Sequence, residues 1–197
     1  GYDVSLSNDG TIVAAGEPYA YSNSGGVRIF KNLGGSWNQL GNAITIYTGQ
    51  NDELGLTVDI SGNGLTLAAG SPYDDDGGND DVGSVKIYNY TPGGNVYTNG
   101  SWGITTEIHG TWPSGEMGRG LSMSYNGNII ALGGTRSNTN GAVNLYTYDG
   151  SSWTNASTFL GEAGGDYYGD QVSLSADGSI VAISGHRNDG NGNNAGH

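Results

Sequence analysis

The sequence predicts an all-β protein built from repeated four-stranded antiparallel units, an organisation typical of a β-propeller. A phrase of the type VSLSNDGTIVAAG occurs in four versions, which begin at Val4, Val58, Leu121 and Val172. A second marker, a tryptophan after a Gly/Ser turn, follows three of the versions at Trp37, Trp102 and Trp153. No apolar period of 3.6 residues continues for as many as about ten residues, so helices are not expected.

Each phrase is predicted to form a β-hairpin, which supplies the first two strands of a unit. In the first version, VSLS meets TIVAAG across Asp9-Gly10, and the later versions turn at Asn63-Gly64, Asn126-Gly127 and Asp177-Gly178. Asn-Gly and Asp-Gly are strong hairpin signals because both residues accept the positive φ of a tight turn. The turn glycines recur about every 50 to 60 residues, a period typical of large repeat units.

A third strand is predicted at VRIFK from Val27, VKIYNY from Val85 and VNLYTY from Val143, and a fourth from each tryptophan. The second strands, TIVAAG, LTLAAG, NIIALG and SIVAIS, are apolar and end in small residues, so we expect them to be buried on both faces. The third and fourth strands carry polar residues and tyrosines and should face solvent. This gradient predicts one propeller segment of about three and a half blades. The repeats span residues 1–54, 55–117, 118–168 and 169–197, of which the last is incomplete.

Short motifs around these hairpins resemble FG-GAP repeats, the blades of the integrin α-subunit propeller and of bacterial, algal and marine surface proteins. The resemblance rests on Leu54-Gly55, Met117-Gly118 and Tyr168-Gly169 before the phrase, and on GEP at Gly16 or GSP at Gly70 after it. It covers essentially the whole chain. The third and fourth versions depart from the pattern, with GGT at Gly133 and SGH at Ser184.

The calcium loop that the resemblance implies, DxDxDG followed by a further Asp, is degraded in all four versions. The ligand positions hold Ser5, Ser7 and Asp9 in the first version and Asp59, Ser61 and Asn63 in the second. The third holds Ser122, Ser124 and Asn126, and the fourth Ser173, Ser175 and Asp177. Calcium needs six to eight oxygen ligands. We therefore expect plain hairpin turns in which Ser and Asp bond to their own backbone.

Composition limits the partners of the protein. The formal net charge is −13, with only 6 Lys and Arg, so nucleic acid would be repelled and is not expected as a partner. Cysteine is absent, which excludes disulfides and Cys-based metal sites. No stretch reaches about 18 consecutive apolar residues, so no membrane insertion is expected.

Acidic residues gather on one predicted face. In an antiparallel meander the connections between second and third strands share a face with the links between blades, and most of the carboxylates fall there: Glu17, Asp52, Glu53, Asp74, Asp75, Asp76, Asp80, Asp81, Glu116, Glu162, Asp166, Asp170 and Asp189. The densest segment contains Asp74, Asp75, Asp76, Asn79, Asp80 and Asp81. It is read either as a solvated acidic loop or as a weak calcium site in which an ion bridges the carboxylates. No cofactor is required.

Tyrosines near the same face offer a second type of site. Tyr19, Tyr21, Tyr73, Tyr167 and Tyr168 fall beside the carboxylates, and rings next to carboxylates can hold sugars by stacking and hydrogen bonding. The alternative is that these rings pack between neighbouring blades. Sequons at Asn89, Asn99 and Asn155 permit N-glycosylation.

Catalysis is not expected, because the sequence contains no GxSxG, phosphate loop or HExxH, and no carboxylate pair is marked as special. The function expected is a non-catalytic extracellular or cell-surface scaffold or adhesion module in a surface or filamentous assembly. The alternatives are a glycan-binding module and, less favoured, an accessory domain of a secreted hydrolase. Since three units and a partial fourth leave strand edges open, other chains or further repeats are the expected partners.

Overall fold

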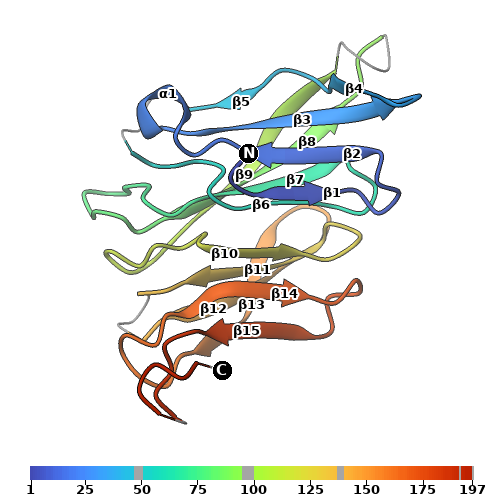
Figure 1. The fold of residues 1–197 in the computed structure, drawn as a ribbon. Helices are drawn as coiled ribbons and strands as arrows, with labels where there is room; N and C mark the ends of the chain where they lie inside the picture. The colour runs from blue at the N-terminus through green and yellow to red at the C-terminus, as the bar shows by residue number, and fades with distance from the viewer. Residues whose placement is uncertain (47–50, 95–99, 137–139, 191, 197) are drawn as a thin grey trace.

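The computed structural model describes residues 1–46, 51–94, 100–136, 140–190 and 192–196, which form four antiparallel sheets (Figure 1). Sheet 1 contains β1 (Val4–Leu6), β2 (Ile12–Gly16), β3 (Gly26–Leu33), β4 (Ser36–Gln39) and β5 (Ile44–Thr45). Sheet 2 contains β6 (Val58–Ile60), β7 (Thr66–Ser71), β8 (Ser84–Thr91) and β9 (Ser101–His109). Sheet 3 contains β10 (Gly120–Met123), β11 (Ile129–Gly134), β12 (Ala142–Tyr148) and β13 (Trp153–Leu160). Sheet 4 contains β14 (Tyr168–Leu174) and β15 (Val181–Gly185).

The predicted strand order is confirmed in the first three sheets, where consecutive strands pair as neighbours. The tryptophans fall at or next to the first residue of β4, β9 and β13. Two elements were not predicted. Strand β5 also pairs with β3, beyond a turn at Gly41. Helix α1 (Ala20–Asn23) is a single turn, in which Tyr21 and Ser22 have left-handed φ angles of 53° and 60°.

The four phrase hairpins are confirmed as β1–β2, β6–β7, β10–β11 and β14–β15. Gly10, Gly64, Gly127 and Gly178 have φ between 67° and 74°, but the preceding Asp or Asn does not have a positive φ, contrary to the expectation. The Asp or Asn contributes its side chain instead. In the fourth turn Ser175 Oγ donates to Asp177 Oδ1 at 2.6 Å and accepts from the Ile180 N–H at 3.0 Å.

This side-chain network occurs in every phrase turn. The Ser-to-Asp/Asn bond measures 2.7, 2.8 and 2.9 Å in the first three turns. In the fourth, hydrogen bonds from Ser175 and Ser179 lower the pKa of Asp177 to about 2. The second and third ligand positions of each degraded calcium loop are therefore bonded to each other within the turn, which fits the expectation of plain hairpin turns.

Replacing Gly64 by valine is expected to destabilise the protein more than the same change at Gly77 in the acidic loop. Both glycines have positive φ, 70° and 61°, so valine strains the backbone at either position. A Cβ at Gly64 would lie 2.5 Å from Cδ1 of Ile12, whereas at Gly77 it meets nothing within 4 Å. The overpacking should add about 1–3 kcal/mol to the loss of unfolding free energy at Gly64. Equal urea midpoints for the two variants would contradict this packing.

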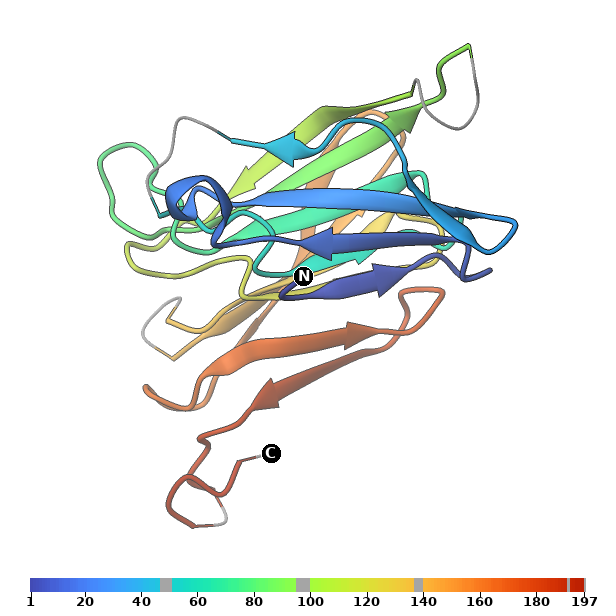
Figure 2. The same cartoon turned by 45° about the horizontal axis from the view of Figure 1, so that its top comes forward.

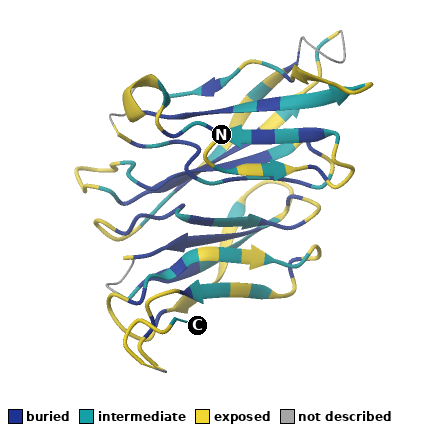
Figure 3. Ribbon diagram, viewed as in Figure 1, coloured by how far each residue is buried: buried dark blue, intermediate teal, exposed yellow. Residues whose placement is uncertain are grey.

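The sheets pack face to face in chain order, from sheet 1 at the top of Figure 1 to sheet 4 at the bottom. We call the side of each sheet that points toward the preceding sheet its upstream face, and the opposite side its downstream face. The downstream face of sheet 1 packs on the upstream face of sheet 2 through Ile12, Ala14, Ile29, Val58, Ile60 and Leu67. Sheets 2 and 3 meet through Ala68, Ile87, Met123, Ile130 and Leu132. These layers form the dark blue interior in Figure 3.

Burial follows the predicted gradient in sheets 2 and 3, where β7 and β11 are almost entirely buried and β9 and β13 are mostly exposed. The prediction is wrong for the fourth version, SIVAIS. Ile180 is 68% exposed, and Ala182 is also exposed. The physical reason is that no described sheet covers the downstream face of sheet 4.

Neighbouring sheets are joined by hydrogen bonds that repeat in register. At the hairpin tips, the Asn8 N–H donates to the Gly62 carbonyl, the Gly62 N–H to the Tyr125 carbonyl and the Tyr125 N–H to the Ala176 carbonyl, at 2.8–3.0 Å. In the first strands, side chains accept from the next sheet: Ser5 from the Ile60 N–H, Asp59 from the Met123 N–H and Ser122 from the Leu174 N–H. We call the first series the tip ladder. Figures 1 and 2 show these tips on one side and α1 with the β7–β8 loop on the other.

Candidate binding pocket

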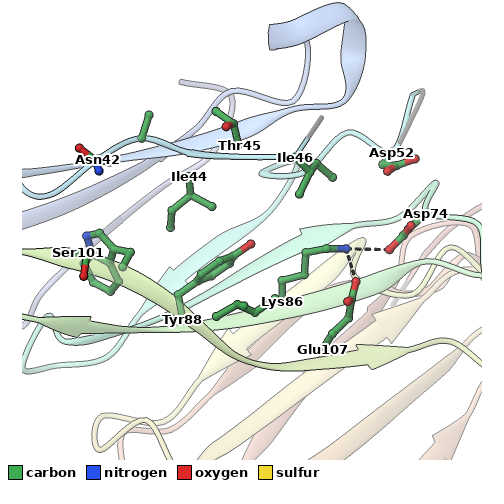
Figure 4. Close-up of a pocket in the computed structure, with 13 residues that line it drawn as sticks. Asn42, Ile44, Thr45, Ile46, Asp52, Asp74, Lys86, Tyr88, Ser101 and Glu107 are labelled. Carbon is green, nitrogen blue, oxygen red and sulfur yellow. Dashed lines mark hydrogen bonds and ion pairs between the residues drawn. The ribbon is translucent and has the colours of Figure 1, made fainter. Parts of the chain in front are cut away.

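A pocket of about 510 Å³ lies where sheet 1 and sheet 2 separate, between β5, β8 and β9 (Figure 4). Antiparallel pairing places the pocket residues of β8 and β9 on one face of sheet 2, because Lys86 is opposite Glu107 and Tyr88 is opposite Ile104. Strand β5 supplies Ile44 and Thr45 from the other side. The pocket thus has an apolar end and a charged end.

Aromatic and aliphatic side chains form the apolar end. Ile44 and Tyr88 are buried there, and Ile46, Trp102 and Ile104 complete the lining. The Trp102 indole is fixed by a 2.9 Å hydrogen bond from Nε1 to the Leu40 carbonyl, and its ring lies 5.2 Å from that of Tyr90. This end offers a rigid apolar surface to a bound molecule.

The charged end is organised around Lys86, which is only 6% exposed. Its ammonium donates to Asp74 Oδ2 at 2.8 Å and forms a second ion pair with Glu107. Ser84 also donates to Asp74. A buried charge needs such pairing to be tolerated. Lys86 is therefore held in place by two carboxylates.

Asp52 lines the same end and is 6% exposed, yet it has no hydrogen-bond partner among the described residues. Burial raises the pKa of the Asp52 carboxyl, and the negative charge of Asp74 raises it further, against the lowering effect of Lys86. A carboxyl that faces a pocket and has no partner among the described residues can accept a hydrogen bond from a bound hydroxyl or amine.

Replacing Asp52 by asparagine is expected to stabilise the protein at about pH 7 and to leave it unchanged at about pH 3. A folded-state pKa raised above the unfolded value favours folding at low pH, and this contribution is lost as pH rises through the folded pKa. Asparagine removes the cost of ionising the buried group. Thermal melts across this range test the prediction.

Asp149 provides a control whose pKa is shifted in the opposite direction. Hydrogen bonds from the Ser152 and Ser151 N–H groups lower its pKa to about 2. Its contribution to stability is present above the unfolded pKa and is lost as pH falls. Asp149→Asn should therefore lower the melting temperature at about pH 7. Identical pH profiles for the two variants would contradict the environment assigned to Asp52.

Three possible metal ligands also meet near this end. One ligand atom each from Asp74, Glu107 and His109 lies within 4.8 Å of the others. The Lys86 ammonium already contacts both carboxylates, so positive charge occupies the space between them. A divalent ion would have to displace a buried lysine, and the geometry does not favour a metal site here.

The acidic segment predicted as a weak calcium site forms the β7–β8 loop, but its carboxylates have different partners. Asp74 turns inward to Lys86, and Asp75 accepts from the Asp81 N–H at 2.9 Å. Asp76 and Asn79 pair with each other as a β-bridge. The Asp80 carbonyl accepts from the Ser114 N–H. Burial and the nearby Asp75 raise the pKa of Asp81. Calcium at this loop stays a prediction.

The predicted tyrosines do not converge on this pocket. Tyr19 and Tyr21, beside and in α1, are 59% and 41% exposed. The Tyr73 hydroxyl accepts from Arg119, and the Tyr167 ring contacts His186 and lies 4.5 Å from the Arg187 guanidinium. Tyr168 begins β14 and is half-buried. The pocket uses Tyr88 and Trp102 instead, which sequence reasoning treated only as strand residues.

Some acidic residues expected on the charged face support the fold instead. Glu116 is buried and accepts hydrogen bonds from Arg119 and Thr135, with a further ion pair to Arg136. Asp166 is buried against the Asn188 amide. Arg119 is only three residues from Glu116, but Thr135, Arg136 and Asn188 come from segments about 20 residues away, so their approach to these carboxylates could not be read from the sequence. Of the sequons, Asn89 and Asn155 are exposed on β8 and β13, and Asn99 lies outside the described residues.

In the part of the chain that the structure describes, no helix has the length and apolarity needed to cross a membrane. Comparisons with known proteins are informative about fold alone. No family model matches the sequence, and no curated protein matches it.

Among solved structures, the chain is similar to hydrazine synthase of Kuenenia stuttgartiensis, with a TM-score of 0.59 and 16% identity over 91% of this chain and 57% of that one. It is also similar to a protein of Bacteroides uniformis described as a putative 6-phosphogluconolactonase, with a TM-score of 0.55 and 16% identity over 91% of this chain and 42% of that one. The chain thus spans about half the length of these proteins. The four antiparallel sheets and these similarities fit a propeller-like, all-β fold.

Proposed function

We propose that the chain is a propeller segment of about three and a half blades, related to FG-GAP repeats, that serves as a non-catalytic scaffold or adhesion module. Its blades are residues 1–54, 55–117, 118–168 and 169–197. The observation that carries the proposal is the repeated use of the phrase residues to join sheets. The tip ladder and the Ser5, Asp59 and Ser122 bonds all serve this purpose.

An extracellular or cell-surface location is part of the proposal, and the exposed sequons Asn89 and Asn155 are compatible with it. The partners are other protein chains or further repeats of the same kind. Calcium, where it binds, binds weakly at the β7–β8 loop. None of these roles requires a chemical step.

The pocket favours one second candidate, a glycan-binding module. A rigid aromatic wall at Trp102 and Tyr88 lies beside the Asp52 carboxyl, which has no hydrogen-bond partner within the described part of the chain. This combination is suited to a sugar, which has an apolar ring face and several hydroxyl donors. This site replaces the tyrosine-bearing loops as the location of that alternative.

A hydrolase is the least supported candidate. One structural neighbour is described as a putative 6-phosphogluconolactonase, at 16% identity. A phosphorylated lactone would meet Asp52, Asp74 and Glu107 against the single positive charge of Lys86 in the pocket. That excess of negative charge repels phosphate rather than binding it.

A glycan array, a lactone-hydrolysis assay and a surface-binding assay on whole cells, each with and without calcium, separate the candidates. The scaffold proposal expects binding to protein-coated or cell surfaces and no hydrolysis of the lactone. It also expects that Asp52→Asn leaves the glycan-array signal unchanged. A glycan signal lost in Asp52→Asn and retained in the exposed-site variant Asp149→Asn would establish the second candidate. Turnover lost in Asp52→Asn would overturn the non-catalytic assignment.

A further inference from the structure

The charged end of the pocket between sheets 1 and 2 holds more negative charge than the chain neutralises. Asp52, Asp74 and Glu107 all line it. Among the described lining residues only Lys86 is positively charged, so three carboxylates face one ammonium (Figure 4). The ammonium has three N–H donors, and its contacts are Asp74, Ser84 and Glu107. None of its donors is left for Asp52.

The fourth unit shows how the fold satisfies a carboxyl at the position of Asp52. Asp166 lies six residues before the fourth phrase, as Asp52 does before the second. The two are similarly buried, at 4% and 6% exposed. The Oδ2 atom of Asp166 accepts a 2.9 Å hydrogen bond from the side-chain amide of Asn188. A donor in the loop after the hairpin thus pairs with this buried carboxyl.

In the second unit, the position of Asn188 holds Asp74. Both residues follow the second strand of a hairpin, and their N–H groups close the same turn, to the Gly185 and Ser71 carbonyls at 3.0 and 3.2 Å. A carboxylate at this position can only accept hydrogen bonds, whereas an amide can donate. Burial raises the pKa of the Asp52 carboxyl, and the negative charge of Asp74 raises it further. Within the described chain, Asp52 therefore lacks the donor that its counterpart has.

The pairing of the strands does not require this set of charges. Lys86 and Glu107 face each other across β8 and β9, and the corresponding pair across β12 and β13 is Asn144 and Thr158. The Thr158 hydroxyl donates to Asn144 Oδ1 at 2.7 Å, so a neutral pair serves the same strands of sheet 3. Buried charges are costly unless they are fully paired. The incomplete pairing at the pocket therefore points to a missing cation.

The apolar end of the pocket limits what can carry that cation. Lys86 and Tyr88 are two residues apart on β8, so their side chains leave the same face of the sheet about 7 Å apart. Ile44 and Trp102 add apolar surface beside the Tyr88 ring. A lysine side chain has this form, because an apolar carbon stem precedes its compact ammonium.

We propose that the pocket binds a lysine side chain presented by a partner protein. The ammonium donates to Asp52 and to Oδ1 of Asp74, an atom that accepts no hydrogen bond from the described residues, and the carbon stem lies along Tyr88. A compact ammonium suits two separate carboxylates, whereas the planar fork of a guanidinium matches one. The net charge of −13 attracts a basic partner. The inference rests on the proposed adhesion function and names the group that the partner presents.

The first experiment compares two peptides that differ by one charge. The probe is acetyl-Gly-Gly-Lys-Gly-Gly-amide, and the control is the same peptide with Nε-acetyllysine, which keeps the stem and removes the charge. The Trp102 indole N–H resonance reports binding, since the Leu40 carbonyl fixes this group at the apolar end of the pocket. The lysine peptide is expected to bind at least about tenfold more tightly than the control. Equal affinities, or a Trp102 resonance that does not shift, overturn the proposal.

Three variants locate the ammonium. Asp52→Asn should weaken binding of the lysine peptide by about tenfold or more, because it removes a carboxylate acceptor. Asp74→Asn should weaken binding as well, because it introduces the amide that Asn188 supplies in the fourth unit and so gives Asp52 a donor. Asp149→Asn removes an exposed carboxylate outside the pocket and should leave the affinity unchanged. An unchanged affinity in Asp52→Asn, or an equal loss in Asp149→Asn, overturns the proposal.

A glucosamine trimer serves as a competitor, because it carries the same ammonium group on sugar rings. Tighter binding of the trimer than of the lysine peptide overturns the lysine assignment and favours the glycan-binding candidate. The surface-binding assay is read separately. If the chain binds surfaces but not the lysine peptide, the proposal for the pocket fails and the scaffold function stands. If it binds the peptide but no surface, only the scaffold function fails.

Discussion

Replacing Gly133 by alanine is expected to lower the free energy of unfolding by about 3 kcal/mol or more. A Cβ at this position would overlap the carbonyl oxygen of Gly169, which is main chain and cannot move alone. Gly16 and Gly70 make the same approach to Gly55 and Gly118, so the contact recurs at each junction between described sheets. Equilibrium urea unfolding measures the loss.

Gly103 in β9 is the matched control, because nothing lies within 4 Å of its Cβ position and its φ is not in the left-handed region. Gly103→Ala should be neutral or slightly stabilising, since alanine restricts the unfolded chain. If the two alanine variants unfolded at the same urea concentration, the close approach between sheets would be refuted.

Truncating Ile130 to alanine is expected to cost about 3 to 4 kcal/mol, whereas Val13→Ala should cost less than about 1 kcal/mol in dilute solution. The two residues occupy the same register position in sheets 3 and 1. Ile130 is fully buried beneath sheet 2. Val13 is only partly buried, because it lines an open apolar groove on the upstream face of sheet 1, beside Leu6 and Phe30. The removed methyl groups therefore leave a cavity in the first case and a wetter surface in the second.

Thermal and urea unfolding of both variants at low protein concentration tests this difference. A large loss for Val13→Ala under those conditions would show that something already covers the groove. A small loss for Ile130→Ala would contradict the packing of sheets 2 and 3.

The sequence predicts the strands and hairpins well, because both depend on local signals. The alternation in VSLS and the glycine after Asp9 are determined by contacts within a few residues. Strand β5 and helix α1 were missed for the opposite reason. Ile44 and Thr45 become a strand only by pairing with β3, and Tyr21 adopts a left-handed φ that no sequence signal marks.

The candidate pocket could not be predicted, because it depends on how two sheets separate. Lys86 and Tyr88 lie in an ordinary alternating strand, and only the structure places Asp52 and Asp74 beside them. The acidic face was predicted from topology alone. Topology assigns a loop to one side of the molecule, but it does not say how deeply the side chains of the loop are buried. Glu116 and Asp52 are on the expected side and are nevertheless buried.

The tip ladder has a consequence for how these repeats can diverge. Its bonds use only main-chain N–H and carbonyl groups, so the bonds themselves do not prescribe a side chain, and this chain has Asn8, Gly62, Tyr125 and Ala176 at the bonded position. Gly62 is the restricted member, because a Cβ there would overlap the Tyr125 ring. The flanking Ser and Gly are restricted by their own bonds and φ angles. New surface chemistry, from an affinity tag to an evolved recognition residue, can therefore be introduced at Tyr125, which is 50% exposed, without breaking the connection between sheets.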